Sequence, residues 1–357
     1  MNLKTYLRIH DSDRARFEEL YARYRLLHDA PEQCRPMIII HTPVDGLPTW
    51  EERLADPLVM LAADLDQLRP HLEMQDDRVP TVRVQFGTAQ VAAAFGCRMF
   101  LPENNLPAAG DHVLAHADAS RVYELALPSL GAGWYGKLDQ WTAIWQEHLP
   151  EGVHIQHPDI QSAFNSAHLI RGNDILTDFY DHPTELDLLL DKVTDFMVAI
   201  TKHTRAAISD DPDWFFDWGA LWKGAARISN CSMHMISPRF YREHVLARDI
   251  RFFQQIGGGR MHYCGTSKKV IDEFFKVPAI TGLDVDTGLH DFYELCGRAP
   301  AHVVVMPTMP FKRNSVEGQR MLAGDWPAKR NIIVSVEAGS VEGGRALLRQ
   351  LRSSLPY

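Results

Sequence analysis

The chain has 357 residues, a formal net charge of -9 and an isoelectric point near 6.0. An acidic chain without clustered basic residues does not have the composition of a nucleic-acid binder. No stretch approaches the ~20 uninterrupted apolar residues of a membrane span, and residues 1–16 lack the apolar centre of a signal peptide. We therefore expect a cytoplasmic protein without a nucleic-acid or membrane partner, and the length allows two domains or one large α/β barrel.

The cysteines are odd in number and spread widely along the chain. They are Cys34, Cys97, Cys231, Cys264 and Cys296. A secreted disulfide framework is usually short and has an even number of cysteines, so reduced thiols are expected here. Most of them are interpreted as small buried apolar groups. Cys264 is the strongest candidate for a functional thiol, whereas Cys296 falls within an expected helix that would direct it away from a site.

The first half of the chain predicts a helical extension followed by the start of a βα pattern. Apolar residues recur at helical spacing over 13–28, and the apolar run 37–40 suits a strand buried on both faces. Further helices are expected over 57–74, 89–95, 163–176 and 183–203, and further strands over 81–86 and 153–156. We divide the chain into an N-terminal helical extension, 1–35, and one larger domain, 36–357.

Residues from about 97 to 150 interrupt this pattern with prolines and glycines. Aromatic residues gather near the end of the segment: Trp134, Tyr135, Trp141 and Trp145. We interpret the segment as an insertion after the second strand. Two roles stay open for it, a lid over a site or a small aromatic core of its own.

From residue 259 onward, strands and helices alternate at short and regular spacing. Strands are expected over 260–264, 279–284, 302–306 and 331–336, and helices over 267–276, 290–297, 315–323 and 341–352. A fourth strand is expected to end just before Ser237, because Ser237 and Pro238 form a helix start. The count then reaches eight βα units, and no Gly-x-Gly-x-x-Gly follows any strand. This pattern predicts an α/β fold of the (β/α)8 TIM-barrel type rather than an open doubly wound sheet.

A candidate metal site lies at the end of the fifth expected strand. His262 and Cys264 stand two residues apart, so both side chains point the same way. Active sites of TIM barrels lie at this end of the strands. Glu337, at the end of the eighth strand, is the expected third ligand, and a fourth position stays open for substrate. A thiolate and an imidazole favour zinc over magnesium.

Two alternatives stay open for these ligands. His262 and Cys264 could be ordinary alternating residues of a buried strand. Glu337 could instead form an ion pair at the rim, with Arg260 or with Arg345.

Side chains at the other strand ends are candidates for substrate binding. They are Gln156, Trp222, Asn230, His234, Asp284, Asp286 and Met306. Asp284 and Asp286 lie two residues apart and could act as acid and base, or could cap the next helix. For His234, Cys231 and Trp222, packing explains the residue as well as a substrate contact does. No catalytic residue is assigned beyond the metal ligands.

Three segments of the chain resemble the uroporphyrinogen decarboxylase superfamily. They are Gly258-Gly-Arg-Met-His-Tyr-Cys-Gly265, Leu169-Ile-Arg-Gly172 and Phe179-Tyr-Asp-His-Pro183. The likeness runs from about residue 80 to the C-terminus. One branch of that superfamily decarboxylates porphyrinogens. Another comprises zinc-dependent methyltransferases that move a methyl group between a corrinoid protein and a thiol such as coenzyme M, or demethylate methoxylated and methylamine-type substrates.

The chain fits the second branch better than the first. The decarboxylases have an arginine-containing run after the first strand and an aspartate after the second, where this chain has Ile40-His-Thr-Pro43 and Gln85-Phe-Gly87. The methyltransferases have the His-x-Cys pair after strand five and a further cysteine after strand eight, where this chain has Val336-Glu337-Ala338. A carboxylate ligand would make the zinc a stronger Lewis acid than a second thiolate would, which suits removal of a methyl group from an ether.

The resemblance therefore implies a zinc-dependent methyltransferase that acts on a small methylated or methoxylated substrate. It also implies a corrinoid-binding protein as partner, and a homo-oligomer is compatible with the sequence. Two alternatives are a decarboxylase-like lyase acting on another carboxylated substrate and a metal-binding barrel without catalytic activity.

Overall fold

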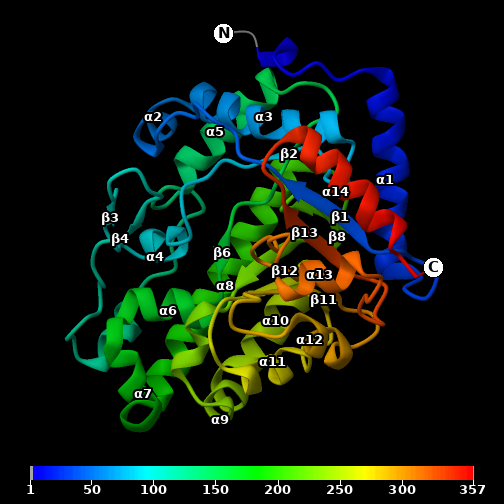
Figure 1. Ribbon diagram of the computed structural model, residues 1–357. Coiled ribbons are helices and arrows are strands. Elements are labelled where there is room, and N and C mark those ends of the chain that lie inside the picture. The colour runs from blue at the N-terminus through cyan, green and yellow to red at the C-terminus, as the bar shows by residue number, and fades with distance from the viewer. Residues whose placement is uncertain (1–2, 357) are drawn as a thin grey trace.

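The computed structural model describes residues 3–356 and has a mixed α/β architecture, with parallel strands through the middle and helices around them (Figure 1). The parallel strands are β1 (Met37–His41), β2 (Thr81–Val82), β5 (His154–Ile155), β6 (Ile160–Gln161), β9 (Ala226–Ser229), β10 (Gly259–Tyr263), β11 (Ile280–Val285), β12 (Val304–Pro307) and β13 (Ile333–Glu337). Two antiparallel pairs are β3 (Met99–Phe100) with β4 (Ala108–Ala109) and β7 (Trp214–Asp217) with β8 (Ala220–Lys223).

The parallel strands pair in an order that follows the chain. Five of them form one sheet in the order β12-β11-β10-β9-β6, while β1 pairs with β13 and β2 with β5. A single bridge from Val305 to Ile332 links β12 to the residue before β13. The expected third strand is split into β5, which pairs with β2, and β6, which pairs with β9. Within residues 3–356 these ladders do not form a complete ring, because none joins β1 to β2.

The seam between β1 and β2 is filled by side chains from α3 (Pro57–Met74) and the loop that follows it. Carboxylates there accept the strand N–H groups that a neighbouring strand would otherwise accept. The pairs are Ile38 N–H to Asp77 Oδ2 (2.7 Å), Ile40 N–H to Asp76 Oδ2 (2.8 Å) and Arg83 N–H to Asp64 Oδ2 (2.9 Å). A wedge of acidic side chains thus replaces one ladder.

The remaining helices cover the strands. They are α1 (Asp11–Asp29), α2 (Trp50–Ala55), α4 (Gln90–Ala94), α5 (Tyr135–His148), α6 (Ala163–Arg171), α7 (Ile175–Asp181), α8 (Pro183–Ile208), α9 (Pro238–Phe240), α10 (Leu246–Ile256), α11 (Lys268–Phe274), α12 (Phe292–Arg298), α13 (Val316–Leu322) and α14 (Val341–Ser353). Most expected helices are confirmed to within a few residues. The helix expected over 163–176 is interrupted, because Gly172 adopts a φ of +72° that ends α6. None of these helices is both long and apolar enough to cross a membrane.

A hairpin that the sequence did not predict precedes the fourth parallel strand. β7 and β8 turn at Trp218 and Gly219, whose φ angles are +50° and +69°. The carbonyl of Gly219 accepts the N–H of Val79 at 2.8 Å, so the hairpin tip lies beside the loop between α3 and β2. Asp217 and Trp222 of this hairpin are buried.

The segment 97–150 packs part of its aromatic residues against the parallel strands. The ring centroids of Trp141 and Phe86 are 4.9 Å apart, and Trp145 Nε1 donates to the carbonyl of Pro57 at 2.8 Å. Leu106 of the same segment borders a central cavity. The segment therefore contributes to the core and to the wall of a cavity.

Candidate metal centre and the adjoining cavity

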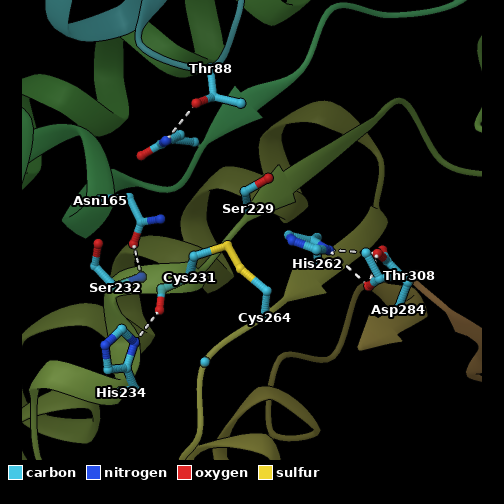
Figure 2. Close-up of a disulfide and its surroundings, with 12 residues drawn as sticks. Thr88, Asn165, Ser229, Cys231, Ser232, His234, His262, Cys264, Asp284 and Thr308 are labelled. Atoms are coloured by element: carbon cyan, nitrogen blue, oxygen red, sulfur yellow. Dashed lines mark hydrogen bonds and ion pairs between the residues drawn. A yellow bond between two sulfur atoms is a disulfide. The ribbon is translucent and has the colours of Figure 1, made fainter. Parts of the chain in front are cut away.

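Three potential metal ligands converge where two neighbouring strands end. One ligand atom each from Cys231, His262 and Cys264 lies within 4.8 Å of the others, and no other such group is found in residues 3–356. The register explains the convergence, because Ser229 of β9 is opposite His262 of β10 and the N–H of Asn230 donates to the carbonyl of His262 at 2.8 Å. Cys231 and Cys264 therefore leave adjacent strands at the same edge (Figure 2).

In the structure the sulfur atoms of Cys231 and Cys264 form a disulfide, with their Cα atoms 5.1 Å apart (Figure 2). This pair differs from the expectation that all thiols are reduced, whereas Cys34, Cys97 and Cys296 are free and buried. Two sulfurs joined to one another cannot both bind a metal as thiolates. Metal binding by this group therefore requires the reduced form.

The imidazole of His262 is held by Asp284. His262 Nδ1 and Asp284 Oδ2 are 2.6 Å apart, and Thr308 Oγ1 donates to the same oxygen at 3.0 Å (Figure 2). Burial alone would raise the pKa of Asp284, but Arg260, His262 and Arg227 outweigh that effect and hold it well below its usual range. An ionised carboxylate only accepts, so it fixes the proton on Nδ1 and leaves Nε2 free for a metal.

Buried ion pairs surround this centre. Asp217 binds both Arg83 and Arg260, Asp159 binds Arg227, and Arg260 Nη1 lies 3.2 Å from Asp284 Oδ1. Burial lowers the pKa of Arg260 to about 9 despite Asp284, so the guanidinium stays charged at neutral pH. Each of these charges has an opposite charge within reach, which is the condition for keeping it inside a protein.

A cavity of about 570 Å³ adjoins the centre. Thr308, whose Oγ1 is 3.3 Å from His262 Nδ1, forms part of its wall, as does Trp218, whose ring centroid is 6.3 Å from that of His262. The wall also includes Asp64 and Arg78 from the β1–β2 seam. The cavity therefore reaches from the acidic wedge to Thr308 and Trp218, the neighbours of His262, while the three potential ligands themselves do not line it.

Some of the substrate-binding candidates lie on this cavity. Gln156 and Met306 line it. The Gln156 side chain is held in place, because its Nε2 donates to Thr81 at 2.9 Å and its Oε1 accepts the N–H of Trp218 at 2.7 Å. Asp284 lies behind His262 rather than on the wall. Gln156 and Met306 thus share one cavity, and Asp284 is the strand neighbour of Met306 in the β11–β12 pair.

The other candidates make different contacts. Asn230 is fully buried and donates to Asp249 at 3.3 Å, and Trp222 is fully buried and donates to the carbonyl of Asp217 at 3.0 Å. His234 Nδ1 is 2.7 Å from the carbonyl of Cys231, on the exposed side of that segment. Asp286 Oδ1 accepts the N–H of Gly288 at 2.8 Å, which is a turn contact. None of these four residues lines the cavity, and a substrate contact by any of them stays a prediction.

Glu337 does not join the metal group. It is exposed, stands opposite His41 in the β1–β13 pair and borders a separate hollow with Lys312 and Arg313. Strands lie about 4.8 Å apart, and β13 follows β12 and β11 before β10 is reached, whereas β9 is the direct neighbour of β10. The group that could hold a metal therefore contains Cys231, and Glu337 is not part of it.

The alternative ion pairs of Glu337 are not formed either. Arg260 binds Asp217 and Asp284, and Arg345 donates to the carbonyl of Glu73 at 2.8 Å. The fourth strand was expected to end just before Ser237, but β9 ends at Ser229, and a short 3-10 helix over Cys231–Met235 separates it from Ser237. An earlier strand end would have put Cys231 beside strand five and could have identified it. Nothing in the sequence pattern pointed to Asp64 or Arg78.

The comparisons with known proteins bear on the fold. No model of a known protein family matches the chain, and no curated protein sequence does. A solved structure of a methyltransferase from Methanosarcina mazei is similar over 94% of this chain and 97% of its own, with a TM-score of 0.68 and 14% sequence identity. At this identity the likeness shows a shared fold and leaves the site to be argued from its own residues.

Proposed function

We propose that this protein is a zinc-dependent methyltransferase whose metal is held by Cys231, His262 and Cys264. The observation that carries the proposal is the convergence of these three ligand atoms, close to a cavity that borders the neighbours of His262. Zinc held by three protein ligands would leave a fourth position for a substrate atom. A shared fold with a protein named as a methyltransferase supports the reaction class. Zinc fits two thiolates and one imidazole, because these are its preferred ligands.

The fold that we propose for this site is a (β/α)8 barrel. Eight parallel strand positions follow the chain in order, if β5 and β6 are counted as one interrupted strand. The Asp64, Asp76 and Asp77 carboxylates take the place of the missing β1–β2 ladder. In such a barrel the metal group and the cavity lie at the strand ends where active sites occur.

The side chains around the metal position have distinct roles in this proposal. Asp284 fixes the His262 proton on Nδ1, and Arg260 with Arg227 keeps Asp284 ionised. When bound, zinc would act as a Lewis acid on the substrate atom in its open position. In transfer to a corrinoid, the bond from the methyl carbon to its heteroatom breaks, the heteroatom keeps the electron pair, and the cobalt(I) pair forms the new bond.

A second thiolate ligand, from Cys231, changes the substrate preference that a Glu337 ligand would have suggested, which was removal of a methyl group from an ether. Cys231 brings more negative charge to the metal than a carboxylate does, which weakens the Lewis acid and strengthens a bound thiolate as nucleophile. The donor set therefore no longer favours an ether over other methylated substrates. We propose a corrinoid protein or a small thiol as the second reactant, in a compartment where Cys231 and Cys264 are reduced.

The test is metal analysis of protein purified with a thiol reductant. We expect stoichiometric zinc in the wild type, its loss in Cys231→Ser and Cys264→Ser, and its retention in Cys296→Ser, whose buried thiol lies in α12 outside the group. Methyl transfer to free cob(I)alamin from a panel of methylated donors should follow the zinc content. Purified protein that contains no zinc would favour the lyase alternative, because that reaction does not need the metal. Protein that contains zinc but transfers a methyl group from none of the donors would favour the metal-binding barrel without activity.

A further inference from the structure

One guanidinium on the cavity wall, that of the partly buried Arg78, differs from the buried arginines near it. Arg78 comes from the loop between α3 and β2 and borders the cavity. In residues 3–356 no carboxylate oxygen lies within 4.0 Å of its guanidinium nitrogens, and its buried Nε has no acceptor. Arg83, Arg227 and Arg260, in contrast, are each paired with an aspartate. The missing acceptor at Nε is shared by all four arginines, so what distinguishes Arg78 is the lack of a carboxylate partner. A partly buried cation without such a partner is costly, so a ligand that supplies acceptors is expected to bind there.

The nearest carboxylates already have partners. Asp76 Oδ2 is 2.7 Å from His71 Nδ1 and accepts the N–H of Ile40, and Asp64 accepts the N–H of Arg83. Asp76 Oδ1 also accepts the backbone N–H of Arg78 at 3.1 Å. Both aspartates act on the Arg78 guanidinium only through space, and burial outweighs them in lowering its pKa. The positive charge of Arg78 is therefore not neutralised by direct contact.

The backbone opposite Arg78 leaves room for this side chain. Gly219, at the tip of the β7–β8 hairpin, has a φ of +69°, and a Cβ added there would lie 2.7 Å from Arg78 Cγ. The hydrogen bond from Val79 to Gly219 holds the two segments together. Because any other residue at 219 would displace Arg78, the hairpin and the loop together determine where the guanidinium lies.

The cavity wall around Arg78 carries both donors and carboxylates. Asp159 is paired with Arg227, and burial raises the pKa of Asp64 to about 6. Burial lowers the pKa of His41, also on the cavity wall, to about 3, so it is neutral at pH 7. Arg83 Nε is buried without an acceptor, like Arg78 Nε. This wall therefore offers more donors than the protein itself satisfies.

We propose that the cavity binds a small carboxylate, with Arg78 as its anchoring residue through paired N–H donors. The planar guanidinium matches the two carboxylate oxygens, and such charge-assisted pairs are the strong hydrogen bonds of proteins. The identity of this ligand as the reacting substrate rests on the proposed function. Binding of the carboxylate itself does not require zinc, since Arg78 belongs to a different wall from the metal group.

The test is calorimetric titration with 4-methoxybenzoate, benzoate and butyrate, each compared with its neutral amide. We expect the wild type to bind at least one of the acids and to bind its amide at least tenfold more weakly. Arg78→Gln should lose at least tenfold in affinity, which corresponds to about 1.4 kcal/mol. Arg78→Lys should keep part of it, and Gly219→Ala should weaken it by displacing Arg78.

Matched measurements separate this role from a structural one. Arg53 borders the same cavity but donates to the carbonyl of Pro48 and lies over Trp50, so Arg53→Gln should bind the acid as the wild type does. Arg78→Gln should unfold at no lower temperature than the wild type, since it removes an unpaired charge. Equal binding of acid and amide, absence of binding for all three acids, or equal affinity in Arg78→Gln would overturn the proposal.

The failure of one proposal can be distinguished from the failure of the other. Arg78→Gln should retain stoichiometric zinc, and Cys264→Ser should retain carboxylate binding. A protein that binds zinc but no carboxylate would contradict the role of Arg78 and leave the proposed metal centre standing. A protein that binds the carboxylate but no zinc would contradict the metal centre and leave the role of Arg78 standing.

Discussion

Two regions beside the same cavity, the surroundings of His262 and the β1–β2 seam, differ in how their charged side chains are paired. On the His262 wall, each arginine has an aspartate partner and Asp284 is held by three groups. At the β1–β2 seam, the aspartates bind backbone N–H groups instead, and Arg78 is left without a carboxylate. Where every arginine has a carboxylate partner, the metal-binding side chains are held in place. A guanidinium without such a partner has donors free for a molecule that binds and dissociates.

Of the changes that test this difference, removal of a carboxylate at the β1–β2 seam should have the largest effect, a loss of folding stability. Asp77 is buried and binds the N–H of Ile38 together with Arg23 and Arg352. Asp77→Ala should lower the free energy of unfolding by about 3–5 kcal/mol, because it leaves a strand donor and two cations without their acceptor. Urea unfolding measures this. A loss below about 1 kcal/mol would mean that the acidic wedge does not hold the seam.

Beside His262, the variant Asp284→Asn tests whether the residue that holds this imidazole affects zinc affinity. The neutral amide accepts the Nδ1–H of His262 more weakly than the carboxylate does and can also turn a donor towards it. Zinc affinity, measured by competition with a chelator, should therefore fall roughly 10–100-fold. Asp286→Asn is the matched control, since Asp286 only accepts a turn N–H. Equal affinities in both variants would remove Asp284 from the centre.

Asp249, which contacts Asn230 next to Cys231, should make the free energy of unfolding depend on pH. It is buried and contacts Tyr241 at 2.8 Å, and burial raises its pKa to about 7. The folded state therefore binds a proton that the unfolded state has released, so this stability is fully present below about pH 4 and is lost as pH rises through about 7.

The variant Asp249→Asn should remove that slope of up to about 1.4 kcal/mol per pH unit and be the more stable protein at pH 8. Unfolding experiments from pH 5 to 8 measure it, with the exposed Asp195→Asn as control. A parallel pH dependence in wild type and Asp249→Asn would show that Asp249 is ionised throughout.

The smallest effect is expected at Glu337. Because it is exposed and outside the metal group, Glu337→Gln should keep its zinc affinity within about twofold, as surface substitutions usually do. Chelator competition on Glu337→Gln and Cys231→Ser compares the two candidates for the third ligand directly. A large loss in Glu337→Gln alone would restore the assignment made from the sequence.

Local spacing in the sequence determined much of this molecule. Hydrophobic periodicity located most helices and seven of the parallel strands, and the Ser237 cap is formed as expected, with its side chain accepting from the N–H of Phe240. The two-residue spacing of His262 and Cys264 put both side chains near one point. These features depend on neighbours along the chain, which a sequence displays directly.

The tertiary structure alone decided which distant residues meet. Cys231 becomes the partner of Cys264 because β9 lies next to β10, while Glu337 is left at another strand end. The acidic wedge at β1–β2 and the unpaired Arg78 beside Gly219 depend on α3 and on a hairpin that no periodic pattern announced. Such contacts join residues far apart in the chain, and their geometry follows from strand order and packing rather than from local spacing.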